Sequence, residues 1–382
     1  TEADYNSAIQ AAQECDTVIM FTRTGATGHG PVFQTDWDLS IDDLEQIKDV
    51  QAAAKANGNK FVLVVNSRSA FTFEGDWLED TDALISAFYA GQAYGTAIAE
   101  ILTGEVNPSG KTTMTFPKKS EDTLLTIDEE TKIERAGDQL HAAENDNSFT
   151  AHYTEGLNFG YRWYDYEDIE PMYAFGHGLS YTTFEYSDLK AQMRDDNQID
   201  VQVTVTNTGD VTGDDIVQVY LGGIDGLPEH VQVAEKQLVA FARVENLKPG
   251  QSKTVSMTIN ERMLSYWDTE LLDEDDPAYD ITEKWVFAEG ARDIMAGGSS
   301  DNLPLVIEDF QVVKTDKSDE EESSVDKVSL REMISTVEAL NEDDYTAASW
   351  GDLQETLEEA KEVADDASAT QSEVDAGFAN LV

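Results

Sequence analysis

The sequence predicts a multidomain protein: an α/β sandwich with a mainly parallel sheet covered by helices, then an antiparallel β-sandwich, then a small three-helix bundle. Three hydrophobic periods predict this order. Helical and apolar-strand patterns alternate up to about residue 117, a period of two begins at about residue 186, and a helical period returns after residue 326. Because 382 residues exceed one ordinary core, roughly two to three domains are expected. We place their boundaries at 1–185, 186–314 and 327–382, with an acidic linker at 315–326.

The first domain is predicted from short apolar strands that alternate with helices. Strands are expected at residues 17–21, 61–65 and 83–88, and a helix that Gly104 ends at residues 96–102. Strands that are apolar on both sides favour a parallel sheet covered by helices. Since ligands in such folds bind beyond the carboxyl ends of the strands, the loops after Phe21 and Val65 are the predicted ligand edge.

An aromatic, glycine-rich segment follows a polar excursion loop at residues 118–150. The segment runs from Tyr153 to Leu189, and its rings suit either sugar stacking or ordinary core packing. Gly176 and Gly178 flank His177 and predict a sharp turn there. The segment therefore reads both as a candidate sugar platform and as a domain junction.

The later domains follow from their own periods. Alternating apolar residues predict sandwich strands around Val201, Val219 and Met257, with turns at residues 207–210 and 248–250 between them. Two apolar stripes beyond the linker predict two helices, and Thr370 with Glu373 forms a capping box for a third.

Composition excludes several classes of protein. The 77 Asp and Glu residues against 25 Lys and Arg give a formal net charge of −52, which argues against nucleic-acid binding. This acidity fits either a high-salt habitat or an exposed cell-surface protein. Cys15 is the only cysteine, so no intrachain disulfide forms, and we expect it to be a small buried hydrophobe. No transmembrane run, signal peptide, metal-ligand spacing or phosphate-binding loop is present, and no cofactor is expected. The chain opens on a helix without an initiator Met, as a fragment or processed product would.

Three motifs resemble glycoside hydrolase family 3, in the part that follows its barrel domain. They are AFYAGQAYGTAIAEILTGEVNPSGKTTMTFP at 87–117, YTEGLNFGYRWYD at 153–165 and EPMYAFGHGLSYTTFEYSDL at 170–189. The sandwich resembles the fibronectin type III-like domain of that family through residues 237–259, and the helical end resembles a FIVAR repeat through residues 343–366. The resemblance implies retaining hydrolysis of a β-linked glycoside by two carboxylates, a nucleophile and a general acid/base.

The nucleophile implied by the resemblance lies on a preceding barrel, which this chain lacks. Asp36-Trp37 and Asp76-Trp77 are superficially similar to the nucleophile motif but lie in the wrong domain. The acid/base glutamate is implied in the loop Phe21 to Ser40, which contains no glutamate and has Thr27 at the matching position. Threonine cannot serve as an acid/base. His29 is the only group of the loop that titrates near neutrality, so it is the candidate acid/base; a solvent-facing or substrate-contacting histidine is the alternative. Asp36 or Asp38 could serve if the loop folds differently.

Four other residues are candidates for substrate binding. Arg23 ends the first strand and Arg68 follows the second, where each either holds sugar hydroxyls or forms a structural salt bridge. Glu155 and Arg162 flank the aromatic segment and either pair with each other or contact substrate. His177, between two glycines, is interpreted as structural.

Three functions remain open from the sequence. The chain is the carboxyl-terminal part of a secreted β-glycosidase, inactive alone; or a non-catalytic carbohydrate-binding or cell-surface attachment module; or an enzyme with a different acid/base. The sequence does not identify the sugar.

Overall fold

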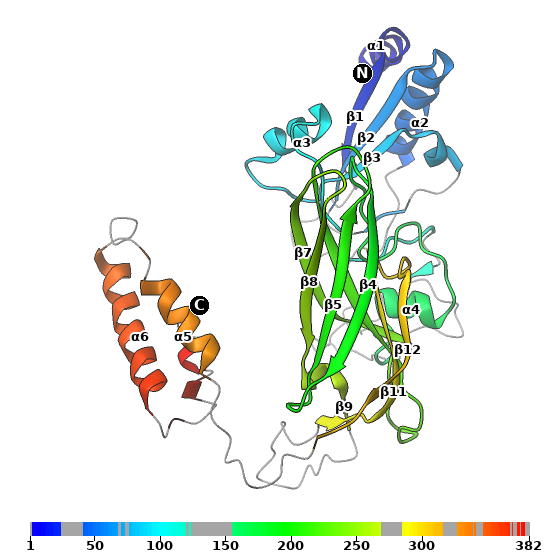
Figure 1. Cartoon of the computed structure of the whole chain (residues 1–382). Coiled ribbons are helices and arrows are strands. Elements are labelled where there is room, and N and C mark those ends of the chain that lie inside the picture. The colour runs from blue at the N-terminus through cyan, green and yellow to red at the C-terminus, as the bar shows by residue number, and fades with distance from the viewer. Residues whose placement is uncertain are drawn as a thin grey trace, which may run out of the picture. The chain divides into compact units, whose positions relative to one another are not determined.

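The computed structural model describes residues 2–23, 41–67, 70–72, 76–119, 122–123, 155–268, 285–315, 327–338, 340, 347–366, 369, 373–374 and 376–378. The chain divides into two compact units, residues 1–315 and 316–382 (Figure 1). The first unit holds a parallel sheet with its helices and an antiparallel sandwich. The second unit is helical.

The parallel sheet predicted for the first domain is present. Its order is β1-β2-β3, made of Thr17–Arg23, Lys60–Asn66 and Ala83–Ser86, and both strand pairs are parallel. Helices α1 (Glu2–Glu14) and α2 (Ile41–Ala56) bury Ala12 and Ile47 against Phe61 and Leu63 of β2. Fully burying one such large apolar side chain contributes about 1.5–3 kcal/mol to the free energy of folding. The packing of the helices on the sheet is therefore stabilised mainly by these buried side chains. Helix α3 (Tyr94–Thr103) ends on Gly104, as predicted, with φ 75°.

Strand β1 is less covered than its apolar sequence predicts. Val18 and Met20 pack on the helix side, whereas Ile19 and Phe21 face the other way and are 42% and 56% exposed. The prediction that strands are covered on both sides is therefore wrong for β1 within the described residues. Cys15 is also exposed rather than buried. It lies after the last residue of α1 and before β1, so it belongs to a connection at the surface and not to the helix face that packs.

The sandwich follows the predicted period of two. One sheet has the order β12-β11-β6-β7 and the other β4-β5-β8. Their bounds are β4 Phe184–Met193, β5 Ile199–Asn207, β6 Gly213–Gly222, β7 Lys236–Leu247, β8 Ser252–Ile259, β11 Gly290–Gly297 and β12 Leu305–Val312. A short antiparallel pair, β9 (Ser265–Trp267) and β10 (Trp285–Phe287), lies beside them. The core is the set of inward residues predicted from the sequence, Ile199, Val201, Val203, Val205, Val217, Val219 and Leu221 among them.

The helical unit contains α5 (Val328–Glu338) and α6 (Ala347–Asp365), with further helical residues at 373–374 and 376–378. Leu330, Ile334 and Leu357 share one core with Val374 and Phe378. Most residues of the predicted stripes on the first two helices are thus buried or partly buried, whereas Leu340 is 38% exposed. In the described residues no helix is long and apolar enough to cross a bilayer.

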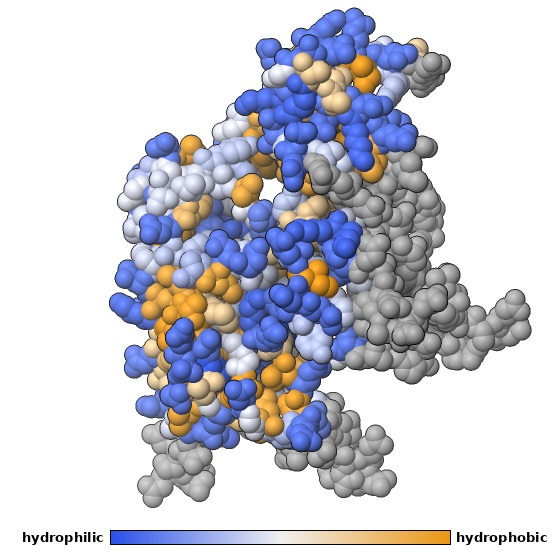
Figure 2. Space-filling view, turned by 90° about the vertical axis from the view of Figure 1, so that its right-hand side faces the viewer, coloured by the Kyte–Doolittle hydropathy of each residue, from blue (hydrophilic) through white to orange (hydrophobic). Residues whose placement is uncertain are grey.

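The described surface is largely hydrophilic. Figure 2 shows hydrophilic residues over most of the described face, with apolar groups between them. A net charge of −52 makes the compact state repel itself, and salt reduces that repulsion because the screening length falls from about 30 Å at 0.01 M to about 3 Å at 1 M.

We therefore expect salt to stabilise this protein. The midpoint of thermal unfolding of the first unit, followed by circular dichroism, should rise by at least about 5 °C between 0.01 M and 1 M NaCl, which corresponds to about 3 kcal/mol for a unit of this size. Choline chloride, which screens charge with a different cation, should give the same shift. A midpoint that stays constant or falls would contradict the expectation.

Candidate functional site

The carboxyl ends of the three parallel strands lie at one edge of the sheet. β1 ends at Arg23, β2 at Asn66 and β3 at Ser86. Asn66 is held in place because its Oδ1 accepts a hydrogen bond from the Tyr94 hydroxyl of α3 at 2.6 Å. Arg23 is exposed, so its guanidinium is accessible at the predicted ligand edge.

This edge also holds polar groups that are left unsatisfied. The hydroxyl oxygens of Ser67, directly after β2, and Ser86 are buried and make no hydrogen bond within the described part of the chain. A buried polar group without a partner costs about 1–3 kcal/mol. Within the described residues, these two hydroxyls therefore have no hydrogen-bond partner.

Several predicted site residues lie outside the described residues. They are His29, Arg68, Thr27, Asp36 and Asp38, and their roles remain predictions. Asp76 is described and begins the short 3-10 helix η1 (Asp76–Asp80).

The aromatic segment is mainly a packing element at the junction of sheet and sandwich. Helix α4 (Tyr161–Tyr166) begins inside it, and Trp163 and Tyr164 are buried. Tyr161 packs on Phe175 at 5.1 Å and edge-on to Tyr220 of β6 at 5.8 Å, measured between ring centroids. Its hydroxyl accepts the backbone N–H of Leu238 at 2.9 Å. The packing interpretation holds for these rings, and the predicted junction is confirmed.

Glu155 and Arg162 do not pair with each other. The Arg162 guanidinium lies over the rings of Phe159 and Tyr161, 5.7 and 5.8 Å from their centroids, and Glu155 is buried. The Arg162 guanidinium thus contacts the aromatic rings of its own segment, and a substrate role for either residue stays a prediction. Phe159, Tyr166 and Tyr181, at 54%, 58% and 48% exposure, are rings of the segment that lie at the surface.

An ion pair joins α4 to the sandwich. Lys236 of β7 contacts Asp165 at 2.5 Å, with both side chains largely buried. Burial raises the pKa of the Asp165 carboxyl, while the Lys236 ammonium acts in the opposite direction. The contact ties the aromatic segment to the sheet that follows it.

The predicted sharp turn is present at Phe175 to Gly178. Gly176 has φ 83°, and the His177 N–H donates to the Ala174 carbonyl at 3.1 Å. The turn pairs with the extended segment around Thr112. The Thr112 N–H donates to the His177 carbonyl at 2.7 Å, and the Gly176 N–H donates to the Thr112 carbonyl at 2.8 Å. A Cβ on Gly178 would lie 2.2 Å from the Gly110 carbonyl oxygen, so only glycine allows this approach.

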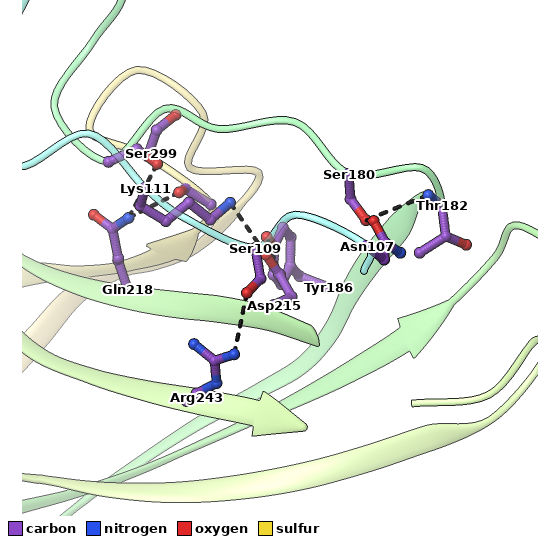
Figure 3. A network of polar contacts seen from close by, with 12 residues as sticks. Asn107, Ser109, Lys111, Ser180, Thr182, Tyr186, Asp215, Gln218, Arg243 and Ser299 are labelled. Atoms are coloured by element: carbon purple, nitrogen blue, oxygen red, sulfur yellow. Dashed lines mark hydrogen bonds and ion pairs between the residues drawn. The ribbon is translucent and has the colours of Figure 1, made fainter. Parts of the chain in front are cut away.

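A buried charge cluster lies at the same junction (Figure 3). The Lys111 ammonium is 3.1 Å from Oδ1 of Asp215 in β6, with side chains only 15% and 4% exposed. The Tyr186 hydroxyl donates to the other carboxylate oxygen of Asp215 at 2.6 Å. Burial, and then the Asp215 charge, raise the pKa of Tyr186, so the phenol stays a donor. Asp215 is thereby satisfied from both domains.

Asn107 fixes the outer end of the junction (Figure 3). Its Oδ1 accepts from the Tyr181 backbone N–H at 2.8 Å and from the Ser180 hydroxyl at 2.9 Å. Its Nδ2 donates to the Thr212 carbonyl at 3.1 Å. One side chain therefore connects the segment after α3 to the aromatic segment and to the start of β6.

The described residues contain no group of three or more His, Cys, Asp or Glu side chains that could hold a metal ion. What they offer is hydrogen bonding and aromatic surface, at the strand-end edge and at the junction.

This architecture matches known domain families. Residues 2–181 match the family model described as the glycosyl hydrolase family 3 C-terminal domain. The chain carries a family 3 C-terminal domain. Residues 215–300 match the fibronectin type III-like domain, so the order of domains agrees with the order of the folds.

Similar proteins are beta-glucosidases. The thermostable beta-glucosidase B of Acetivibrio thermocellus is 33% identical over 303 residues, and beta-glucosidase B of Emericella nidulans is 33% identical over 312 residues. Each alignment covers 78% of this chain, but 36% and 34% of the relative. A solved beta-glucosidase from Streptomyces venezuelae in complex with D-glucose superposes with a TM-score of 0.67 at 29% identity, covering 81% of this chain and 36% of that one. The chain thus spans about a third of the length of the curated relatives it matches.

The junction of the family 3 C-terminal domain contains residues that sequence reasoning missed. Lys111, which follows Pro108-Ser109-Gly110, and Asp215 were not among the residues predicted to form a site. The signal for Asp215 was its position two residues before Val217, because alternate residues of a strand share one face and Val217 and Val219 are buried on β6. A charged residue at an inward position of a strand predicts a buried partner.

Removing one partner of this buried pair should be costly. Lys111→Met leaves the Asp215 carboxylate without its cation, and we expect the free energy of unfolding in urea to fall by about 3–5 kcal/mol. Adding Asp215→Asn should recover part of that loss, because the amide still accepts from Tyr186 and carries no charge.

The control is Lys118→Met, whose partner Glu170 is 2.5 Å away but exposed, with side-chain exposures of 47% and 85%. That change should cost less than about 1 kcal/mol. Equal losses of unfolding free energy at the two lysines would show that the buried Lys111 pair stabilises the fold no more than the exposed Lys118 pair.

Proposed function

We propose that this chain is the carboxyl-terminal part of a family 3 β-glycosidase of the beta-glucosidase type, which hydrolyses O-glycosidic bonds of β-linked carbohydrates. The observation that carries the proposal is coverage: about four fifths of the chain aligns with beta-glucosidases, and it accounts for about a third of each. In this function the chain supplies one wall of the active site. A barrel on the remaining part of the polypeptide supplies the nucleophile.

The strand-end edge is the wall that faces substrate. Arg23 is exposed there, and the hydroxyls of Ser67 and Ser86 lack partners within the described part. A neighbouring domain that covers this edge both satisfies such groups and excludes water from the reacting bond. Arg23 and Arg68 then hold sugar hydroxyls through charge-assisted hydrogen bonds.

Retaining hydrolysis needs a proton donor for the leaving group. The loop from Phe21 to Ser40 contains no glutamate, and His29 is its only group that titrates near neutral pH. His29 is accordingly the proposed acid/base, with Asp36 or Asp38 in its place if the loop brings them closer.

The chain alone is expected to be inactive. With 4-nitrophenyl β-D-glucoside, turnover should not exceed the rate in buffer, because no nucleophile is present. A chimera that joins the amino-terminal two thirds of the Acetivibrio thermocellus enzyme to this chain should hydrolyse the same substrate. Retaining hydrolysis by the isolated chain would sink the proposal.

The chimera also tests the proton donor. His29→Ala should slow release of a poor leaving group such as methanol by about 10²-fold or more, and should spare 2,4-dinitrophenolate, which needs little protonation. Equal effects on the two substrates eliminate His29. A folded chimera that binds glucosides but hydrolyses neither substrate favours the second candidate, a non-catalytic carbohydrate-binding module that kept the scaffold after losing the glutamate.

The helical unit has a separate proposed role, as a FIVAR-like three-helix module that attaches the protein to a cell surface or wall. Its own core supports independent folding, as does Lys327, whose ammonium donates to the α6 carbonyls of Val363 and Ala364 at 3.1 and 3.3 Å. This role implies a secreted or surface-bound protein.

Attachment is tested by sedimentation with isolated cell-wall polysaccharide. The full chain should be retained at least about tenfold more than a chain ending at Thr315, and protein added to intact cells should remain in the surface fraction. Equal retention of the two chains would remove the attachment role.

A further inference from the structure

A pocket of about 450 Å³ opens at the junction between the family 3 C-terminal domain and the sandwich. Its walls come from three separated segments: residues 108–111, the turn and strand at 176–186, and residues 298–302, with Asp214 and Asp215 at the base of β6. Figure 3 shows several of these side chains converging. The volume lies within the roughly 300–1,000 Å³ that is usual for small-molecule sites.

The lining of the pocket is mixed. Pro108, Leu179 and Phe184 supply apolar surface, and Leu179 is 77% exposed. Ser109, Ser180 and Ser299 supply hydroxyls. A sugar ring uses both kinds of contact, because its C–H faces pack while its hydroxyls form hydrogen bonds.

The charges of the pocket are only partly compensated. Lys111 pairs with Asp215 at 3.1 Å, and Arg243 pairs with Asp214 at 2.5 Å. Asp301 also lines the pocket, and its carboxylate accepts the Ser299 hydroxyl at 2.5 Å. This carboxylate repels an anionic ligand and accepts hydrogen bonds from hydroxyl groups, so the pocket suits a neutral polyhydroxylated ligand.

His177 gives the pocket a polar group that is available for bonding. Its ring lines the pocket and stacks on Tyr173, 5.0 Å between centroids. Burial lowers the pKa of His177, an effect that Asp301 opposes and Lys111 reinforces. A neutral imidazole offers one donor and one acceptor, which is the pair that vicinal hydroxyls match.

We propose that this junction pocket binds a neutral polyhydroxylated ligand, a monosaccharide unit held by the His177 imidazole and packed on Leu179 and Phe184. The site is separate from the strand-end edge and requires no barrel. It can therefore bind in the chain as it stands, whether or not the chain takes part in catalysis.

The test is titration of the isotope-labelled full chain with D-glucose, cellobiose and D-glucuronate, followed by NMR. Glucose or cellobiose should give saturable shifts at the junction, with a dissociation constant on the order of 1 mM, which is typical of so small a ligand. Glucuronate should bind more weakly because of its charge. Tighter binding of cellobiose than glucose would identify the end of a polysaccharide as the ligand, rather than a free monosaccharide.

Two variants locate the site. His177→Phe keeps the stack on Tyr173 and removes both nitrogens, and should weaken binding at least about tenfold. Leu179→Asp changes an exposed side chain, so the fold is retained if His177→Phe proves unstable, and it should also weaken binding. His230→Phe removes a histidine that pairs with Asp268 outside the pocket and should leave affinity unchanged.

Three outcomes would overturn the proposal. They are shifts that do not saturate, affinity that is the same in Leu179→Asp and wild type, and shifts confined to residues outside the junction. None of them bears on the chimera, whose hydrolysis depends on the strand-end edge.

Discussion

The pairing of the segment around Lys111 with the turn at His177 is the constraint on which the rest of the first unit depends. Two backbone hydrogen bonds connect these segments, and the Lys111 ammonium then reaches Asp215 of the sandwich. Because Gly178 lies against the Gly110 carbonyl, the two backbones approach more closely than any side chain would permit. The family 3 C-terminal domain and the sandwich are therefore joined through a shared polar seam and not through a flexible linker.

Much of this fold could be predicted from local patterns. The period of two placed the β5 and β6 core at Val201 and Val219, and the alternation of helix and strand gave the parallel sheet. Such patterns report which face of an element is buried, but not what covers it. That is why Phe21, apolar within an apolar strand, was expected to be buried and is exposed. Cys15 failed for a related reason, since its residue type favours burial but its place between two elements decides otherwise.

The candidate site was less predictable because it is built from long-range partners. Arg23 was correctly placed at the end of β1, since strand ends follow from the period alone. The Lys111–Asp215 pair joins residues more than a hundred positions apart, and the sequence around either residue does not indicate its partner. Arg162 shows the reverse case, in which a plausible near partner, Glu155, lost to the adjacent rings of Phe159 and Tyr161. Aromatic faces compete with carboxylates for arginine, and sequence spacing does not decide between them.

The seam explains why a pocket and a rigid joint occur at the same place. Gly110, Gly176, Gly178 and Gly298 line the pocket, and none of them fills it with a side chain. Gly178 brings two backbones together, whereas a Cβ on Gly176 or Gly298 would meet the side chain of Gln218 or Tyr186. The volume left over is bordered by the Lys111–Asp215 pair, by the Asp301 carboxylate, and by His177, which the turn holds against Tyr173. A cavity with an imidazole and a carboxylate in its wall therefore follows from the way the two domains are joined, independently of the barrel on which hydrolysis depends.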